Sequence, residues 1–229
     1  MTAPFPTHKQ EDWRYADLDA LQPVWDQFAE PVTLTVGAGE QLEEVWLPSS
    51  GDVQMRRVQL ALGKGAKARI FALGTAPVYG RIELEVSLAE GAEFELFGAN
   101  IGAGGRSRQV VRSVLNGKAV GSYLGKVEVA RGAQQTDAEQ SVKAMLLDRG
   151  ATANCKPELE IFADDVKCAH GATVGELDPM QLFYAESRGL DPASARALLL
   201  EAFVMGLWDG ASDADAICEA ARDALRRVV

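Results

Sequence analysis

The sequence has few cysteines, an excess of acidic over basic residues, and no long apolar run, and each shortage excludes a class of protein. Three cysteines, Cys155, Cys168 and Cys218, are too few and of the wrong parity for the disulfide framework of a small secreted protein. No stretch approaches the roughly 20 apolar residues that a membrane-spanning helix needs. The net charge of −10 argues against duplex binding, because nucleic-acid affinity comes mainly from Lys and Arg.

Two further signals are missing. Residues 1–9 lack the basic and apolar segments of a secretory signal, so a cytoplasmic location is expected. The glycine-rich stretches 63–65 and 102–107 do not match the phosphate-binding loop of nucleotide-binding proteins, so any ATP chemistry is expected in a partner.

Residues 101–131 hold several basic residues and a single acid, Glu128, which permits a basic patch, although a solvated edge or a protein interface explains the same charges.

A short unit built around Gly-Ala recurs along the chain. It spans 62–70 and 88–96, which places Gly65 and Gly91 26 residues apart. Around it, apolar residues alternate at period two, as expected for strands with one buried face. A looser copy stands another 26 residues upstream at 36–42, and further copies with changed spacing stand at 129–133 and 147–151. The alternating residues are Val58, Leu60, Leu62, Ile82, Leu84, Val86, Leu88, Phe94 and Leu96.

Short strands with glycine corners that repeat about every 20 to 26 residues are typical of a β-solenoid, in which each coil is buried by its neighbours. The alternative is a β-sandwich built from hairpins. Hairpin turns favour Asn-Gly or Asp-Gly, and between the alternating segments only Asn116-Gly117 is of that kind. The pattern therefore favours the solenoid.

From Asp178 onward the pattern becomes helical. Asp178-Pro179 and Asp191-Pro192 each offer an N-cap followed by proline at the first helical position, and Gly189 is placed to end the first helix. A third helix is predicted to begin at 212–215. The predicted apolar stripes are Leu198, Leu199, Ala202, Phe203 and Leu207 in the second helix and Ile217, Ala221 and Leu225 in the third. Near the N-terminus, 11–18 predicts a short helix or anchored arm, whose apolar residues are Trp13, Tyr15 and Leu18.

The densest polar stretch, 164–171, contains Cys168 and His170. On a strand the two side chains share a face about 7 Å apart. Thiolate and imidazole are ligands that zinc and iron favour, so the pair is a candidate metal site. Two alternatives stay open, namely that Cys168 is a small core residue and that His170 is a hydrogen-bonded structural histidine. Cys155 and Cys218 are interpreted as packing residues.

An enzyme that uses Cys168 as nucleophile and His170 as base is a further alternative. It requires the two groups within hydrogen-bond reach, with an oxyanion-binding loop beside them. Neighbours at i and i+2 on a flat strand rarely meet that requirement.

The segment 157–161 followed by 163–175 resembles the C-terminal signature of the SufB/SufD family. The sequence Lys167-Cys168-x-His170-Gly171 resembles the SufD branch rather than the SufB branch. Further matches are Leu182-Phe183-Tyr184, Ser187-Arg188-Gly189, Ala195-Arg196, residues 134–140 and residues 11–15.

The resemblance implies a mainly β protein with a right-handed parallel β-helix core. The expected divisions are an N-terminal arm at 1–30, the β-helix at 31–177 and a C-terminal helical domain at 178–229. Family members generally carry a larger helical N-terminal region, whereas here the motif around Trp13 lies almost at the start of the sequence, so only a short arm is expected. The implied role is a non-enzymatic scaffold of the SufBCD complex in iron–sulfur cluster assembly, which pairs with SufB and docks the ATPase SufC.

Carried over by position, His170 would help hold the cluster at the subunit interface, with Cys168 as its companion. The SufC-docking candidates are Phe183, Tyr184, Arg188, Ala195, Arg196, Leu199 and Phe203. Phe183 and Tyr184 have an alternative role, which is to pack the helices onto the last coil.

The resemblance implies no stably bound cofactor in the isolated chain, a transient iron–sulfur cluster in the complex, and ATP only through the SufC-like partner. A homodimer of the isolated chain is possible, and neither nucleic acid nor membrane is expected. The rival functions are a β-helical acyltransferase or sugar-active enzyme with His170 as base, and a homodimeric adaptor without a metal role.

Overall fold

The structure is a computed structural model that describes residues 5–10, 18–27, 31–46, 53–72, 79–89, 92–95, 106–208 and 213–227. Its strands are β1 (Val32–Val36), β2 (Gln41–Trp46), β3 (Val53–Leu62), β4 (Lys67–Ala72), β5 (Tyr79–Leu88), β6 (Glu93–Glu95), β7 (Arg106–Leu115), β8 (Val120–Val129), β9 (Asp137–Leu146), β10 (Thr152–Ile161) and β11 (Lys167–Gly175). Its helical segments are α1 (Leu18–Leu21), η2 (Gln22–Gln27), α2 (Pro179–Ser187), α3 (Pro192–Met205), η3 (Gly206–Trp208) and α4 (Ala214–Arg226).

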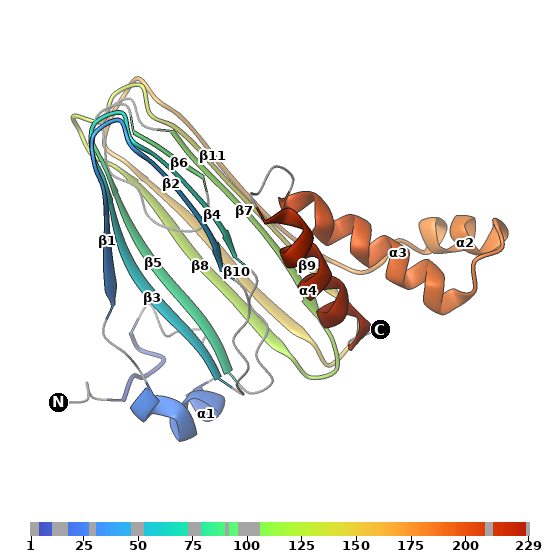
Figure 1. Cartoon of the computed structure of the whole chain (residues 1–229). Coiled ribbons are helices and arrows are strands. Elements are labelled where there is room, and N and C mark those ends of the chain that lie inside the picture. The colour runs from blue at the N-terminus through green and yellow to red at the C-terminus, as the bar shows by residue number, and fades with distance from the viewer. Residues whose placement is uncertain are drawn as a thin grey trace.

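The strands form a parallel β-solenoid with two walls (Figure 1). One wall is a six-stranded sheet in the order β11-β9-β7-β6-β4-β2, and the facing wall consists of the sheets β1-β3-β5 and β10-β8. Every pair of neighbouring strands is parallel. The predicted solenoid is therefore confirmed, and the hairpin sandwich is wrong.

The register confirms the repeat and shows where its length changes. Val58 pairs with Val32, 26 residues earlier, and Gln59 donates to Glu85 at the same separation. In the later coils Gln140 pairs with Gln109, which lies 31 residues before it. The shorter period belongs to the early coils and the longer one to the late coils.

The Gly-Ala corners have a simple physical basis. Gly65 has φ of 65° and Gly39 has φ of 72°, a region that costs other residues free energy but not glycine. The alanine that follows Gly65 points inward, and Ala66 is fully buried. Corners of successive coils are also hydrogen bonded to each other, as between Lys67 N–H and the Glu40 carbonyl at 2.9 Å.

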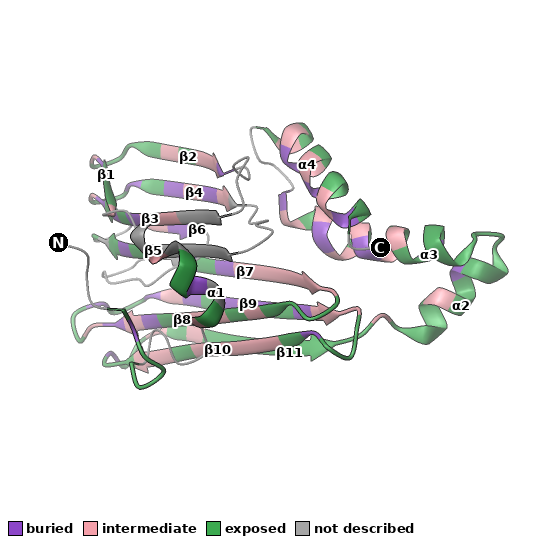
Figure 2. Cartoon of the chain, turned by 90° about the horizontal axis from the view of Figure 1, so that it is seen from below, coloured by how far each residue is buried: buried purple, intermediate pink, exposed green. Residues whose placement is uncertain are grey.

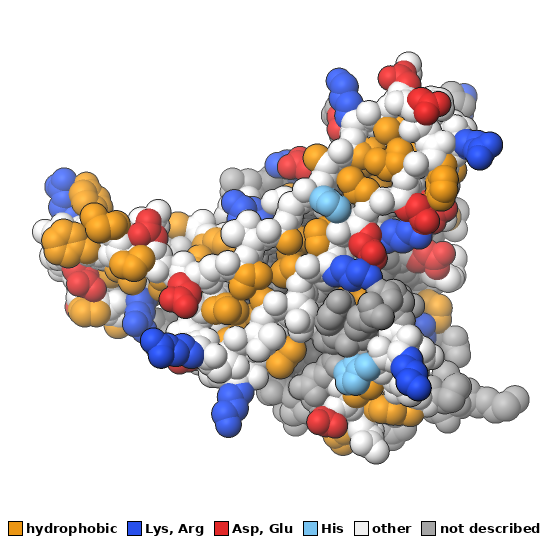
Figure 3. Space-filling model, turned by 180° about the vertical axis from the view of Figure 1, so that it is seen from behind, with side chains coloured by type: hydrophobic (Ala, Val, Ile, Leu, Met, Phe, Trp, Pro, Cys, Tyr) orange, Lys and Arg blue, Asp and Glu red, His pale blue; other side chains and the backbone are white. Residues whose placement is uncertain are grey.

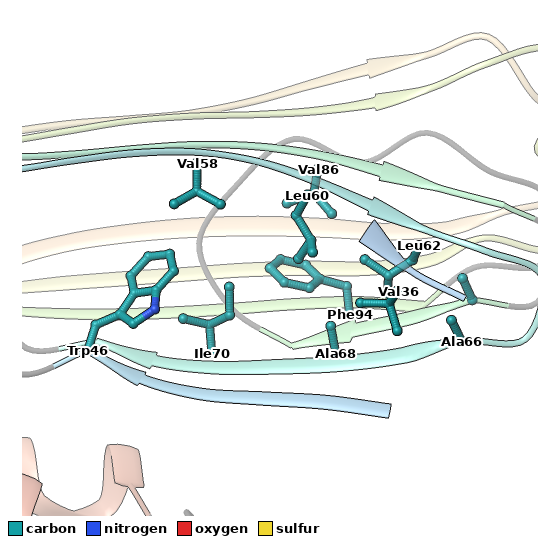
Figure 4. Close-up of a cluster of buried hydrophobic side chains, with 11 residues drawn as sticks. Val36, Trp46, Val58, Leu60, Leu62, Ala66, Ala68, Ile70, Val86 and Phe94 are labelled. Carbon is teal, nitrogen blue, oxygen red and sulfur yellow. The ribbon is translucent and has the colours of Figure 1, made fainter. Parts of the chain in front are cut away.

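The interior differs between the two halves of the solenoid. Apolar side chains from both walls fill the early coils, with Phe94 at the centre and Trp46 at one end (Figure 4). Val58, Leu60, Leu62 and Val86 are buried there as predicted, and Leu84 packs against them. The side chains of Ile82 and Leu88 and the whole of Leu96 lie outside the described residues. In the late coils the described interior is smaller and more polar, with Ser107, Gln109, Thr136 and Gln140 buried.

The C-terminal helices begin where the sequence predicts. The Asp178 side chain accepts from Met180 N–H at 2.8 Å, and Asp191 accepts from the N–H groups of Ala193 and Ser194. Gly189 ends α2 with φ of 95°. Asp213 occupies the N-cap position of α4 without a side-chain cap bond. No described helix is long and apolar enough to cross a membrane.

The stripe predicted for the second helix is confirmed only in part, since Phe203 and Leu207 pack on the buried cluster while Leu198 and Ala202 are exposed; the stripe of the third helix is confirmed. In α3 the buried side chains are Ala195, Leu200 and Val204, and Leu198 is 53% exposed. The reason is that α3 contacts α2 on one side and α4 on another, so apolar residues surround it and periodicity alone does not select one face. In α4, Ile217, Ala221 and Leu225 are buried as predicted.

The helices dock on the outside of the six-stranded wall. Val204, Trp208, Ile217 and Ala221 form a buried cluster, and Val45, Phe71 and Val114 pack on it from β2, β4 and β7. In Figures 1 and 2, α4 lies along this wall, whereas α2 and the first half of α3 extend away from the solenoid.

The described strands run from Val32 to Gly175 and the C-terminal helices from Pro179 to Arg226. Before them, Leu21 of α1 is fully buried, and the rings of Phe5 and Trp25 meet edge to face at 5.4 Å. The predicted landmarks Trp13 and Tyr15 lie outside the described residues. The domain limits 1–30, 31–177 and 178–229 remain predictions.

Candidate functional site: the open end of the solenoid

The last coil ends the solenoid without a described coil above it. Strand β11 is the terminal strand of its sheet and pairs only with β9 in the described part of the chain. Its residues continue the inward-facing columns of β9, yet most of β11 is exposed (Figure 2). Figure 3 looks onto this end, where hydrophobic side chains lie in rows between the strands; Phe162 and Val174 are among the exposed ones.

His170 and Cys168 both lie on β11, with different surroundings. Cys168 is paired with Ala138, is half-buried, and packs on the cluster that contains Val127 and Val129. Burial raises the pKa of the Cys168 thiol; the Asp137 carboxylate adds to this, and a backbone hydrogen bond at Ala138 opposes it. His170 is exposed and pairs with Gln140 on the coil below. The predicted pair therefore shares one face, with the imidazole at the open end and the thiol in the wall.

A buried polar network lies directly below His170. The side-chain amide of Gln140 donates to Gln109 Oε1 at 3.1 Å and to the Tyr123 hydroxyl at 3.3 Å. Tyr123 also donates to Gln109 Oε1 at 3.1 Å. Gln140 is 1% exposed, and its Oε1 has no hydrogen-bond partner among the described residues. Because an unpaired buried acceptor costs about 1–3 kcal/mol, this oxygen is a candidate ligand-facing group.

Glycine creates the space for Tyr123. A Cβ on Gly125 would lie 2.1 Å from the Tyr123 hydroxyl oxygen, so the phenol occupies the place where another residue would carry its side chain. Burial raises the pKa of Tyr123 to about 12, and the nearby Cys155 thiol adds to this, while the Gln140 hydrogen bond opposes it. Tyr123 is therefore a neutral hydrogen-bonding group at physiological pH.

Cys155 also belongs to this end of the interior. It pairs with Tyr123 on the neighbouring strand and therefore faces the same side of its sheet. Burial raises the pKa of the Cys155 thiol. Sequence reasoning assigned Cys155 to packing, because the alternation of β10 does not reveal which interior residue lies next to it.

The predicted docking residues on and beside α2 are exposed or line a groove. Phe183 is 66% exposed and Tyr184 59% exposed, so they do not pack the helices onto the last coil. Arg188 lies over the Tyr184 ring at 5.0 Å, and Leu199 lines an open groove between α2 and α3. Sequence reasoning missed the groove residues Met180, Gln181, Ala185, Leu190 and Leu198.

The remaining docking candidates differ in exposure. Arg196 is exposed, whereas Ala195 is fully buried and offers no surface. Phe203 packs on the cluster that joins the helices to the sheet. The Arg112 guanidinium lies 5.8 Å from the Phe203 ring, and its Nη1 donates to the Val111 carbonyl at 2.9 Å. Phe203 thus has an internal role in joining α3 to β7.

The basic stretch near residue 110 is partly neutralised by acids of neighbouring coils. Arg108 lies 3.8 Å from Glu139, and Lys126 forms ion pairs with both Glu128 and Glu160. These pairs favour the interpretation as a solvated face.

Within the described residues no group of three or more His, Cys, Asp or Glu side chains is arranged to hold a metal ion. His170 and Cys168 are thus at most part of a coordination shell, since a closed zinc site needs about four ligands.

Taken together, these features define a class of protein, namely a parallel β-solenoid with an open last coil and a helical segment at its C-terminal end. Comparison with known proteins finds a match over just under half of the chain: residues 92–203 match the family model described as "SUF system FeS cluster assembly, SufBD core domain". Over these residues the chain is similar to the core domain that SufB and SufD proteins share, and relatives named SufD place the similarity on the SufD side.

Individual relatives show the same similarity. The chain is 38% identical over 107 residues to the iron-sulfur cluster assembly protein SufD of Escherichia coli, covering 47% of this chain and 25% of that protein. It is 46% identical over 102 residues to the chloroplastic protein ABCI7 of Arabidopsis thaliana, covering 43% and 21%. A SufBD family protein of Synechocystis is 41% identical over 105 residues, covering 46% and 23%. The matched segments thus span a quarter or less of these relatives.

Proposed function

We propose that the chain is a SufD-like scaffold subunit of iron–sulfur cluster assembly that pairs with a SufB-like β-helical subunit and docks a SufC-like ABC ATPase. It acts by holding its partners, without catalysing a reaction, and works in the cytoplasm. The support is the SufBD core match at 92–203 together with relatives whose names carry SufD and iron–sulfur cluster assembly.

The observation that carries the proposal is the open last coil. Within the described residues, the strand β11 has backbone groups available on the side away from β9, and most of its inward column is exposed. A β-solenoid buries each coil against the next, so a coil of similar shape from another subunit is the partner that fits this end. Exposed apolar side chains beside it, including Phe162 and Val174, add area that gains free energy when buried.

A second surface suits the ATPase. The groove between α2 and α3 is apolar, lies on the part of the helices that extends from the solenoid, and carries exposed Phe183 and Tyr184. Aromatic and arginine side chains contribute most of the binding free energy in many interfaces, and Arg188 lies against Tyr184 here.

The cluster itself is treated as cargo. In this proposal His170 and Cys168 present an imidazole and a thiol to a nascent iron–sulfur cluster where the two β-helical subunits meet. Donors from the partner complete its coordination, because these two side chains provide too few ligands alone. No stably bound cofactor is proposed for the isolated chain, and ATP is bound by the SufC-like partner.

Co-purification with separated docking surfaces tests the proposal. Tagged chain purified from its own cells is expected to recover a β-helical subunit and an ABC ATPase. Val174→Asp at the open end should lose the β-helical partner and retain the ATPase, whereas Phe183→Asp should do the reverse, because each charge is placed on one surface only.

Thr35→Asp, on the exposed side of β1 in the first coil, is the matched control and should retain both partners. Recovery of neither partner by the unchanged chain would refute the scaffold function. Recovery of a second copy of this chain in place of the β-helical partner would favour the homodimeric adaptor.

A further inference from the structure

The corner between β7 and β8 is built on the dipeptide Asn116-Gly117. Hairpins favour this dipeptide, yet here it joins strands that lie in different sheets. Gly117 has φ of 63°, and the Ala119 N–H donates to the Asn116 carbonyl at 3.0 Å, which closes the turn. The asparagine side chain gives this corner a chemistry of its own.

An asparagine followed by glycine can lose ammonia by attack of its own main chain, because glycine has no Cβ to keep its nitrogen away from the asparagine side chain. The backbone nitrogen of Gly117 gives up its proton and bonds to the side-chain carbonyl carbon of Asn116. The bond from that carbon to the side-chain nitrogen breaks, and this nitrogen leaves with the proton as ammonia. Water then opens the resulting succinimide ring to aspartate or isoaspartate, so water is the only co-reactant.

Asp148 contacts the atom that attacks. The Gly117 N–H donates to Asp148 Oδ2 at 2.8 Å, from one coil to the next. A hydrogen bond to a carboxylate is stronger than one between neutral groups, so the proton is firmly held. A carboxylate is far too weak a base to remove an amide proton, and its negative charge disfavours the amide anion that would attack. The contact therefore slows the loss of ammonia.

The next coil also fixes the shape of this corner. The Leu147 N–H donates to the Leu115 carbonyl at 2.8 Å, which ties the two coils together where the corner begins. A Cβ on Gly150 would lie 2.6 Å from the Gly117 carbonyl oxygen, so the two corners touch. The peptide group of Gly117 thus has little room to rotate toward the Asn116 side chain.

We propose that Asn116 is a deamidation site and that Asp148, from the next coil, protects it for as long as the late coils stay stacked. Separation of the two corners frees the Gly117 nitrogen, and the reaction follows. Isoaspartate adds a methylene group to the main chain of the corner, and either product adds a negative charge near Asp148. Deamidation therefore opposes restacking of the coils. The inference goes beyond the scaffold function and does not rest on it.

Mass spectrometry of peptides that contain Asn116 measures the reaction in the full chain, kept in neutral buffer at physiological temperature. The unchanged chain should deamidate slowly when folded and rapidly in urea. Asp148→Ala should deamidate about 10-fold faster or more when folded, as expected for loss of a hydrogen bond to a charged group, and at the unchanged rate in urea. Asp148→Asn keeps an acceptor of the same shape without the charge and should lie between the two. Asp164→Ala, at an exposed position between β10 and β11, is the matched control and should leave the rate unchanged.

Two outcomes would overturn the inference. One is an equal rate in the folded unchanged chain and in folded Asp148→Ala, and the other is a rate in the folded unchanged chain as high as in urea. Circular dichroism of every variant shows whether it is folded, and Asp148→Asn provides the decision if Asp148→Ala does not fold. The measurement needs no partner protein, so its result is independent of the co-purification that tests the scaffold function.

Discussion

At the scale of single residues, the contacts inside the late coils depend on which particular side chains point inward. The alternation of apolar and polar residues does not reveal this. Alternation along β8 and β9 predicts which side chains point inward. It does not predict that Tyr123, Gln109 and Gln140 meet there, because that contact depends on which coil lies above which. The sequence did single out Cys168 and His170, since a thiol and an imidazole in an acidic stretch are conspicuous.

Replacement of His170 tests the cluster role directly. His170→Ala is expected to lower cluster formation in the reconstituted complex, because an exposed imidazole at the open end is removed. The isolated subunit should stay folded, since the side chain is not part of the core. The measurement is cluster yield from visible absorption, with circular dichroism for the fold. Unchanged yield would exclude a ligand role for this residue.

Gly125→Ala is expected to destabilise the chain by about 1–3 kcal/mol, the usual cost of overpacking a filled interior. The new methyl group would lie 2.1 Å from the Tyr123 hydroxyl oxygen and 2.4 Å from Cζ, so the ring must leave the Gln109 and Gln140 bonds. Urea unfolding measures the loss. Gly175→Ala, also on a strand but with no atom of the described residues within 4 Å of its Cβ position, should change stability little.

At the scale of elements, local sequence signals predicted where strands turn and helices begin better than they predicted which face of a helix is buried. Corners at Gly39 and Gly65 require positive φ, and helix starts at Asp178 and Asp191 require a side-chain acceptor. Such requirements involve neighbours in sequence and are visible there. The buried face of α3 was predicted only in part, because it depends on contacts with α2, α4 and the sheet, which are distant in sequence.

The two aspartates that begin α3 and α4 form a natural comparison. Asp191→Ala should increase hydrogen exchange at Ala193 and Ser194, because their N–H groups lose the side-chain acceptor. Asp213→Ala should have a much smaller effect, because Asp213 makes no cap bond. Equal effects of the two substitutions would contradict the assignment.

The same cap has a predictable pH dependence. Hydrogen bonds from Ser194, and then from the backbone, lower the pKa of Asp191. A carboxylate whose pKa is lowered in the folded state stabilises the helix at pH values above the ordinary pKa of 3.8. That contribution to stability is lost as the pH falls through the folded-state pKa. The exchange difference between the unchanged chain and Asp191→Ala should therefore disappear in acid.

At the scale of the whole molecule, an apolar cluster on the outer side of the six-stranded wall joins the helices to the solenoid in the described part of the chain. Trp208 is 3% exposed in the cluster with Val204, Ile217 and Ala221. Side chains from β2, β4 and β7 complete it. The sequence predicted both parts and not their contact, because outward apolar residues such as Val45 and Phe71 resemble ordinary surface residues of a strand.

Trp208→Ala is expected to cost about 3–5 kcal/mol, the usual range for a buried aromatic side chain. Because Trp208 belongs to the contact between two parts, the loss should release α3 and α4 and leave the solenoid folded. Limited proteolysis should then cut between β11 and α2 while the strand signal in circular dichroism persists. Leu198→Ala on the exposed side of α3 is the control and should leave the protease pattern unchanged. Cooperative loss of all structure would show that the two parts fold as one unit.

The bare face of β11 makes the measured stability of this chain depend on its surroundings. Any molecule that covers that face binds the folded chain and not the unfolded one, so it raises the melting temperature by mass action. At a free concentration about a hundredfold above its Kd, the gain is about 2.7 kcal/mol. A thermal-shift screen of the isolated chain is thus a direct assay for whatever completes the stack.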